Sequence, residues 1–440
     1  MSTKDVKDYF KYCQEFTKEY GKKTVVWIEV GSFMEIYGLD MEKRKEGVVE
    51  EVTKLLNIAM TRKNKKNAHS TSNPLMAGIT APHFYKYVPI LLTAGYTVVE
   101  IRQVTPAPNP KREVTEIHSP GVSLRTNIHE TKYGRADSNY LVTVVVDWIP
   151  PYRNKSGFHS FGIGKIDVST GETTVSQTCE RGQLDQQLNS YDFREIAVYY
   201  VENTPKDQEL NFGNTLTHFY DLDHNFTKAS YRDEYLREFY PKTGVITPIE
   251  WLGLERHEYS CMAFCAMLQF VHKHNPKLCN MMRPPQLLEE GKLLRLDASS
   301  LQQLQITPDK NARILNHGIR GLTDLLAFAC TAPGKRFLYN RLTQPIRDSV
   351  ELEKRYLQIE NMKKIKSIRE CLNGVYDLER LHRKMAIQLL TPGQFLNADK
   401  SYRQISEVFA LLQKSKKNIP EFSINIADTA IALEKFCAEY

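Results

Sequence analysis

The sequence predicts an α/β protein that continues into an all-α part. Apolar residues alternate between strand and helix spacing up to about residue 230, and helical spacing dominates after it. A chain of 440 residues also suits about three domains. We therefore expect a mixed α/β domain at residues 1–125, a second α/β domain at 126–250 and an incomplete helical domain at 251–440.

The elements of the first domain follow from spacing and from the residues that end them. Apolar side chains recur at helical spacing from Val6 to Tyr20, and Gly21 follows as a stop. The run from Thr24 to Val30 is rich in β-branched and aromatic residues, as in a buried strand. Further expected elements are helices at 48–56 and 82–92 and strands at 96–104 and 113–118.

Strand patterns dominate the second domain and helical patterns the third. Apolar runs at 141–146, 161–168 and 173–177 predict an antiparallel meander, followed by a helix at 184–188 and a strand at 196–201. In the third domain Thr323 and Thr391 are expected to cap helices. The charges of Asp377–Arg380 are expected to pair between helices. Other helices are predicted near 337–342, 352–362, 375–390, 395–412 and 426–436.

The stretch from Thr24 to Gly38 contains an aromatic residue and a carboxylate two positions apart. Gly31 and Ser32 allow the backbone to turn after the strand. If the next residues are extended, Phe33 and Glu35 project from one face, roughly 7 Å apart. From this stretch alone, the favoured interpretation is that Phe33 faces a core and Glu35 lies at its rim.

A basic segment follows in the same domain. Residues 61–73 are polar and show no periodicity, so we expect a surface loop. Its cations, Arg62, Lys63, Lys65 and Lys66, either face solvent or contact the phosphates of a nucleic acid. The whole chain has 59 Lys and Arg against 52 Asp and Glu, a mildly basic balance that is compatible with nucleic acid but is not evidence for it.

Composition bears on compartment and metal chemistry. No apolar run approaches the ~18 residues of a membrane span, and the N-terminus lacks an apolar signal core. We therefore expect an intracellular, soluble protein without membrane partners, with the cytoplasm, nucleus, mitochondrion or a viral factory all possible. Cys261 and Cys265 share a helix face, but no second pair completes a zinc site. Buried thiols and no metal are the expectation.

A series of short motifs runs through most of the chain. In order, they are GSFME from Gly31, LNIAMTRK from Leu56, PLMAGITAPH from Pro74, LTAGYTVVEIRQV from Leu92, SPGV from Ser119, LDASSLQQLQI from Leu296, GLTDLL from Gly321, TAPGKRFL from Thr331 and DLERL from Asp377. Each motif alone is weak. Together, and in this order, they resemble the MutS family of DNA mismatch-repair proteins.

The resemblance implies what each part would do. The first domain would bind mismatches, the second would be a connector of ribonuclease H type, and the third would begin the family's core and lever domains. Phe33 would act as a wedge at the mispaired base and Glu35 would hydrogen-bond that base. The segment Met76–Ile79, with His83, would shape the first domain rather than touch DNA. Double-stranded DNA with mismatches or loops is the expected partner, and a MutL-like repair protein could bind the connector.

The resemblance also implies an ATPase domain with a P-loop, which this sequence lacks. The nearest candidate, Gly334-Lys335-Arg336, has Arg where Ser or Thr would bind Mg²⁺. We therefore expect no enzyme activity from this chain. ATP and Mg²⁺ are expected only with the missing domain, as is most of the family's dimerisation. We interpret the chain as a fragment or a shortened protein.

Two alternatives remain open. Asp147 and Asp167 end adjacent predicted strands, and paired carboxylates are the start of a two-metal nuclease site of ribonuclease H type. Asp at a strand end is, however, also common as a turn residue. The other alternative is a structural remnant that binds repair partners and binds DNA without preferring mismatches.

Overall fold

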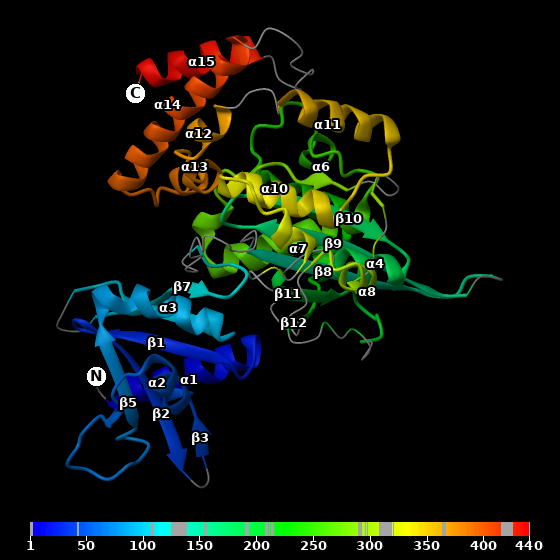
Figure 1. Cartoon of the computed structure of the whole chain (residues 1–440). Helices are drawn as coiled ribbons and strands as arrows, with labels where there is room; N and C mark the ends of the chain where they lie inside the picture. The colour runs from blue at the N-terminus through cyan, green and yellow to red at the C-terminus, as the bar shows by residue number, and fades with distance from the viewer. Residues whose placement is uncertain are drawn as a thin grey trace. The chain divides into compact units, whose positions relative to one another are not determined.

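Two mixed β-sheets and a series of α-helices make up the computed structural model of the chain (Figure 1). The structure describes residues 3–41, 44–106, 110–124, 139–153, 156–189, 193–206, 210, 212, 215–288, 293–294, 296, 298–307, 319, 321–362, 367–414 and 426–439. Unit 1 holds the described residues within 1–129, 139–179 and 193–286, and unit 2 holds the remainder. Both sheets lie in unit 1 except for Leu287 at the end of the second, so the prediction of a mixed α/β part is confirmed.

The first sheet has the strand order β4-β5-β2-β1-β6-β7. Its strands are β1 (Thr24–Val30), β2 (Phe33–Met41), β4 (Thr61–Arg62), β5 (Leu75–Thr80), β6 (Thr97–Gln103) and β7 (Arg112–His118), with β3 (Arg44–Glu46) paired to β2. The helices α2 (Val49–Leu56) and α3 (Phe84–Thr93), preceded by the short η1 (Ala81–His83), share a core with one face. Helix α1 (Thr3–Tyr20) packs on the other face, where Tyr9 donates a hydrogen bond to the Val26 carbonyl.

Strand β5 was not predicted, although its full length pairs with the segment of β2 that begins with Phe33. The segment Met76–Ile79 was expected only to shape the core and a turn, and the structure instead places it in a strand between β2 and β4. Ala77 and Ile79 are buried in the core, whereas Gly78 and Thr80 are exposed on the opposite face. A glycine inside a short apolar run hides this alternation in the sequence.

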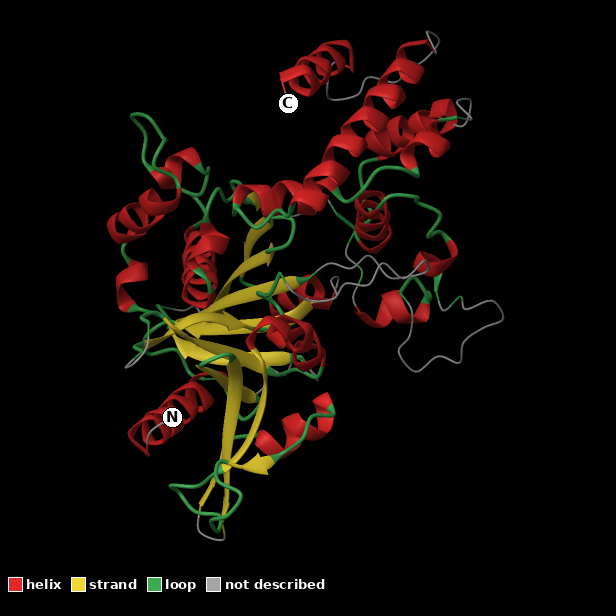
Figure 2. Ribbon diagram, turned by 90° about the vertical axis from the view of Figure 1, so that its left-hand side faces the viewer, coloured by secondary structure: helices red, strands yellow, loops and turns green. Residues whose placement is uncertain are grey.

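The second sheet has the order β12-β11-β8-β9-β10-β13. Its strands are among those drawn in yellow in Figure 2. The predicted meander is confirmed, because β8–β9 and β9–β10 are antiparallel. The sheet continues with β11 parallel to β8 and with β12, which was not predicted, parallel to β11. The strands are β8 (Tyr140–Ile149), β9 (Phe158–Asp167), β10 (Glu172–Thr178), β11 (Phe193–Tyr200), β12 (Leu216–Asp221) and β13 (Gln286–Leu287).

Helix α7 (Glu258–His274) packs closely on β9. A Cβ at Gly162 would overlap the Tyr259 carbonyl, and a Cβ at Gly164 would lie 3.2 Å from the Ala263 carbonyl, so these glycines allow the close approach. The thiols of Cys261 and Cys265 are free and buried on this helix, as predicted. The predicted boundary at residue 250 assigns α7 to the helical core domain, whereas in the structure it belongs to unit 1.

Other helices of unit 1 are η2 (His224–Thr227), α5 (Ala229–Phe239), α6 (Pro248–Trp251) and η3 (Pro276–Cys279). Unit 2 contains α4 (Arg181–Asn189), α8 (Ala298–Gln303), α9 (Leu322–Leu325), α10 (Ala332–Thr343), α11 (Ser349–Met362), α12 (Ile368–Leu372), α13 (Leu378–Ala386), α14 (Pro392–Lys414) and α15 (Ile426–Glu439). Thr391 caps α14 as predicted, accepting from the Gln394 N–H. Thr323 does not cap a helix: it lies inside α9, and its buried hydroxyl has no partner.

The residues that follow β7 bond to a buried carboxylate of the second sheet. The Ser119 hydroxyl and the Gly121 N–H donate to Oε2 of Glu195 at 2.5 and 2.9 Å, and His218 Nε2 lies 2.8 Å from Oε1. A Cβ at residue 121 would lie 2.8 Å from the Cβ of Glu195, so only glycine fits without a shift. The SPGV motif therefore attaches the first sheet to the second. Although burial favours the neutral acid, the His218 and Ser119 bonds hold the pKa of Glu195 below its usual range.

An ion-pair cluster joins α10 to α13 in unit 2. Arg336 contacts both carboxylate oxygens of Asp377, at 2.6 and 2.7 Å, and also reaches Glu379. Asp377 in turn caps α13, accepting from the Arg380 N–H. The prediction that the charges of Asp377–Arg380 pair between helices is therefore confirmed.

We expect Glu195→Gln to weaken unit 1 mainly above pH 4.5. A carboxylate whose pKa is lowered on folding contributes stability that is present above its unfolded pKa, about 4.3, and lost as pH falls through its folded pKa. The loss at pH 7 should be about 1–3 kcal/mol, the cost of impairing charge-assisted hydrogen bonds. Urea unfolding at pH 7 and at pH 4 measures it. The exposed Glu202→Gln is the control, and an equal loss at both pH values would contradict the assignment.

We expect Arg336→Met to destabilise unit 2 by about 3–5 kcal/mol, because it leaves Asp377 largely buried without its main partner. Thermal or urea unfolding of the full chain tests this. Arg403→Met, which breaks an exposed pair with Asp399, should cost less than about 1 kcal/mol. Equal losses of stability from the two variants would mean that the Arg336–Asp377 pair contributes no more to stability than an exposed ion pair.

Candidate nucleic-acid interface

The hairpin that joins β1 to β2 exposes an aromatic ring. Val30 pairs with Phe33, so Gly31 and Ser32 form a two-residue turn, and Gly31 has a φ of +61° that favours glycine. Phe33 is 46% exposed, while the next residue, Met34, is fully buried in the core. Glu35 is half-buried. The predicted extended geometry, with Phe33 and Glu35 on one face, is confirmed, and the alternative that Phe33 is packed in the core is wrong.

On the β5 side, the neighbours of Phe33 and Glu35 are polar or small. Phe33 lies between Val30 on β1 and Thr80 on β5, and Glu35 lies between Ile28 and Gly78. A Cβ at Gly78 would stand 3.4 Å from Cγ of Glu35, so the glycine leaves the space beside the carboxylate empty. The MAGIT segment therefore forms the flank of the Phe33-Met34-Glu35 strand.

Glu35 has a protein partner that the sequence did not reveal. The hydroxyl of Tyr37, two residues further along β2, donates a hydrogen bond to Oε2 of Glu35. Tyr37 is buried under α1, where its ring meets that of Tyr9 edge-on. The period of two along a strand was the available signal, since it places Phe33, Glu35 and Tyr37 on one face.

The strand pairing places the root of the loop with the four predicted cations away from Phe33. The loop that holds them leaves the sheet where β4 pairs with Leu75 and Met76 of β5, whereas Phe33 pairs with Thr80. Five residues of strand separate the two points, about 17 Å. Lys65 and Lys66 are exposed, as expected for a surface loop, and Lys63 is half-buried.

Two of the loop's residues have internal structural roles. The Arg62 guanidinium donates to the carbonyls of Asn67 and Lys65 at 3.0 and 3.1 Å. The Asn73 side chain donates to the carbonyls of Asn64, Asn67 and Ala68. These bonds order the loop from within, and they occupy part of Arg62, while the ammonium groups of Lys65 and Lys66 stay on the surface.

A cation that no sequence pattern indicated lies at the base of the hairpin. Arg112 Nε and Gln103 Nε2 both donate to the carbonyl of Glu29, the residue before Val30, at 2.8 and 3.2 Å. Arg112 therefore sets positive charge beside the strand that leads to Phe33. In the sequence, Arg112 sits in an ordinary mixed-charge strand, so no local pattern distinguishes it.

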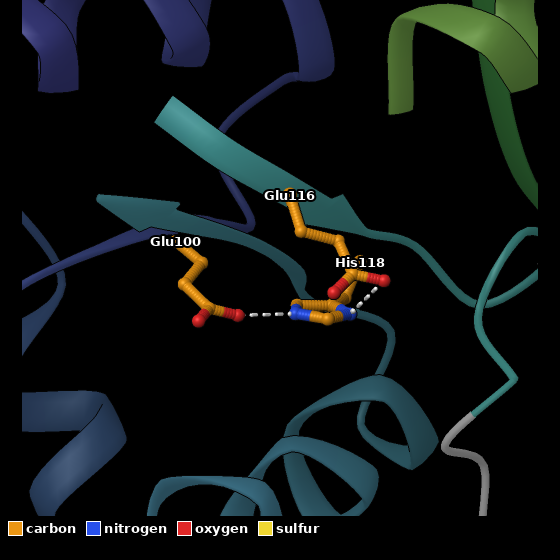
Figure 3. A group of neighbouring side chains, drawn as sticks. All are labelled: Glu100, Glu116 and His118. Carbon is orange, nitrogen blue, oxygen red and sulfur yellow. Dashed lines mark hydrogen bonds and ion pairs between the residues drawn. The ribbon is translucent and has the colours of Figure 1, made fainter. Parts of the chain in front are cut away.

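A compact cluster of carboxylates and imidazole lies on the α3 side of the first sheet. Within the described part of the chain, Glu100, Glu116 and His118 converge closely enough to be considered as metal ligands (Figure 3). Glu100 lies 2.9 Å from Nε2 of His118, and Glu116 lies 3.6 Å from Nδ1, so the carboxylates meet opposite nitrogens of one ring. Each ring nitrogen therefore already has a carboxylate beside it, which disfavours a single ion held by all three residues.

The partners of Glu100 also oppose a metal there. Besides His118, Tyr85 and Arg102 donate to Oε1 of this carboxylate. Burial raises the pKa of Glu100, but the bonds from His118 and Arg102 hold it below its usual range. The cluster therefore ties β7 to β6 on the face opposite Phe33, and it does not belong to the exposed hairpin.

The alternative of a nuclease site at Asp147 and Asp167 is wrong. In the antiparallel pair β8–β9, Asp147 faces Ser160 and Asp167 faces Tyr140. Seven residues of strand, about 24 Å, separate the two carboxylates, whereas the ions of a two-metal site lie about 4 Å apart. Both carboxylates have structural partners: Tyr259 donates to Asp147 at 3.0 Å, and the Ser169 hydroxyl donates to Asp167 at 2.6 Å.

The fold and this hairpin define a multidomain protein with a sheet domain that presents an aromatic–carboxylate pair. None of the helices in the described residues is long and apolar enough to cross a membrane. Two family models match the chain, MutS domain I at residues 9–127 and MutS domain III at residues 299–436. The chain belongs to the MutS family.

Curated relatives match nearly the whole chain. A DNA mismatch repair protein mutS homolog of Acanthamoeba polyphaga mimivirus is 28% identical, and the match covers 92% of this chain and 39% of that protein. The DNA mismatch repair protein MutS of Caldanaerobacter subterraneus is 25% identical over 90% of this chain and 43% of its own length. That of Fervidobacterium nodosum is 24% identical, with coverage of 91% and 44%. The chain thus spans about two fifths of the length of these relatives.

Proposed function

We propose that this chain recognises mispaired or looped double-stranded DNA as the recognition part of a mismatch-repair protein. The observation that carries the proposal is the exposed Phe33 at a tight hairpin, with Glu35 beside it on the same open face. Family membership and the names of the relatives support the same conclusion.

The preference for mismatched over matched DNA would come from the energy needed to deform the duplex. A mispaired base offers no fixed edge to read, but its pairing and stacking are weakened. An apolar side chain that enters the minor groove unstacks a base step and kinks the duplex, which costs on the order of a few kcal/mol at a sound step. Unstacking costs less free energy at a base step that a mispair has weakened. This difference in cost would give the preference for mismatched DNA. The Phe33 ring can stack on any base, so the wedge tolerates any sequence.

Glu35 would accept a hydrogen bond from the displaced base. A bare carboxylate near phosphates is repelled, so Glu35 favours binding only where a base N–H satisfies it. The open space left by Gly78 allows a base to approach the carboxylate. Phe33 would respond only to the shape and stacking of the base. Glu35 would add the requirement that the displaced base carries a hydrogen-bond donor.

The basic loop would contact the backbone away from the lesion. The strand distance of about 17 Å between Phe33 and the loop corresponds to about five nucleotides of one DNA strand. Lys65, Lys66 and Lys63 are the proposed phosphate contacts, whereas Arg62 is partly occupied by loop carbonyls. These contacts would raise affinity without reading sequence.

We propose that the second sheet is the family's connector, of ribonuclease H type, and that a MutL-like protein binds it. Its meander followed by two parallel strands supports this assignment. We propose no ATP or Mg²⁺ site and no enzyme activity in these residues. The one candidate P-loop lies in α10, where Arg336 is bound to Asp377 and Glu379. Dimerisation would depend mainly on an ATPase domain.

We expect Phe33→Ala to remove the preference for mismatched over matched duplex while leaving the fold intact. Loss of one ring–base stack should weaken mismatch binding by roughly 5- to 150-fold. Both affinities are measured by fluorescence anisotropy at one stated salt concentration. Phe219→Ala, which removes an exposed ring from β12, is the control and should leave the preference intact. An unchanged ratio in Phe33→Ala would refute the wedge, and a wild-type chain without preference would favour the partner-binding remnant.

We expect the Lys65→Ala, Lys66→Ala double variant to weaken binding to matched and mismatched duplexes equally. Each lost phosphate contact should reduce the slope of log affinity against log salt by about 0.9. A titration across salt concentrations gives the slope. Lys11→Ala, on the exposed side of α1, should change nothing. If the double variant keeps the wild-type slope, the loop is simply solvated.

A further inference from the structure

Tyr37 links the exposed hairpin to helix α1. Its ring is only 1% exposed and meets Tyr9 edge-on, with ring centroids 5.2 Å apart. The Tyr37 N–H donates to the Tyr9 hydroxyl at 3.1 Å, and that hydroxyl donates to the Val26 carbonyl on β1 at 2.9 Å. Both the backbone and the ring of Tyr37 are therefore fixed by neighbours that do not belong to the open face.

The fixed hydroxyl engages only one oxygen of the Glu35 carboxylate. Tyr37 Oη donates to Oε2. Among the described residues, no hydrogen bond or ion pair reaches Oε1. A carboxylate whose one oxygen is held keeps the other as an acceptor, so the Glu35 side chain is restrained in one orientation with an acceptor in reserve.

We propose that Tyr37 is a positioning residue for mismatch recognition, which holds Glu35 so that Oε1 accepts a hydrogen bond from an N–H donor of the displaced base. This inference rests on the proposed function of Phe33 and Glu35. A restrained Glu35 loses less side-chain entropy when the base binds, which is the usual benefit of a preorganised site. The chemical class selected is an unpaired base with an exposed ring or exocyclic N–H.

In the opposite role, Tyr37 would compete with the base for Glu35. This role predicts the opposite effect on mismatch affinity when the Tyr37 hydroxyl is removed. A competitor would have to be released when DNA binds, so deleting its hydroxyl would strengthen mismatch binding. Tyr37 cannot move away easily, because it is buried and anchored through Tyr9 to β1. The geometry therefore favours positioning.

The test is Tyr37→Phe in the full chain, alone and combined with Glu35→Ala. Alone, it should lower the ratio of mismatched to matched affinity by roughly three- to tenfold and leave matched binding unchanged. In the Glu35→Ala background, the same change should have no further effect on the ratio, because Tyr37 acts only through Glu35. Probes are duplexes that differ only by one mismatched pair.

A matched control exists in the same domain. The buried Tyr96 also donates from its hydroxyl to a carboxylate, that of Glu51, at 2.7 Å, and the next residue, Thr97, pairs with Thr24 at the end of β1 that is far from the hairpin. Tyr96→Phe should remove similar stability in thermal unfolding while keeping the mismatch ratio. A fall in the ratio for Tyr96→Phe as large as that for Tyr37→Phe would reduce the effect to lost stability and overturn the inference.

Other outcomes separate the inference from the proposed function. An unchanged or raised ratio in Tyr37→Phe, or an equal fall with Glu35 absent, overturns the positioning role of Tyr37. If Phe33→Ala has lost the preference in the same assay, the proposed function stands and only the inference fails. If Phe33→Ala keeps the preference, the proposed function itself fails.

Discussion

The register of β2 between β1 and β5 is the constraint on which the rest of this structure depends. Side chains alternate along a strand, so a slip of one residue would bury Phe33 and expose Met34. The register is fixed on one side by the two-residue turn at Gly31 and Ser32, and on the other by pairing of Phe33 with Thr80. The burial of Met34 and Ile36 in the core strongly favours this register over any other. Exposure of Phe33 is thus a by-product of burying its neighbours.

The two faces of this sheet have different partners. One face is closed by the apolar side of α2 and α3, and the cluster around His118 adds polar bonds there. The other face is covered by α1 only over part of its length, where Tyr9 reaches Val26 and Tyr37. Phe33 and Glu35 lie on that second face, beside the exposed Gly78 and Thr80. The first sheet therefore has one face packed against helices and one face that is partly open, and the open part is suited to binding a ligand.

The sequence predicted most elements that form by local rules and missed those that depend on distant pairing. The helices at Val6–Tyr20 and after Thr391 have apolar periodicity and clear stops or caps, so they were found. Strands β5 and β12 were missed, since Gly78 interrupts one and the other shows weak alternation. In the candidate site, Phe33 and Glu35 were predicted by motif. Tyr37 and Arg112 were not, because their contacts, to Glu35 and to the Glu29 carbonyl, arise only when the sheet forms.

The proposed wedge would also impose a requirement on the protein itself. Recognition by deformation works only if the DNA yields before the hairpin does, because a soft hairpin would bend away equally at sound and mispaired steps. Unstacking a base step costs on the order of a few kcal/mol, which is similar to the free energy that holds a loop of low stability in place. Here the turn has two residues, both strands are paired, Met34 is anchored in the core, and Tyr37 is tied through Tyr9 to β1. If the proposed wedge is right, the stiffness of this support, more than the chemistry of the ring, would therefore set how much of the difference in stacking between two base steps becomes a difference in affinity.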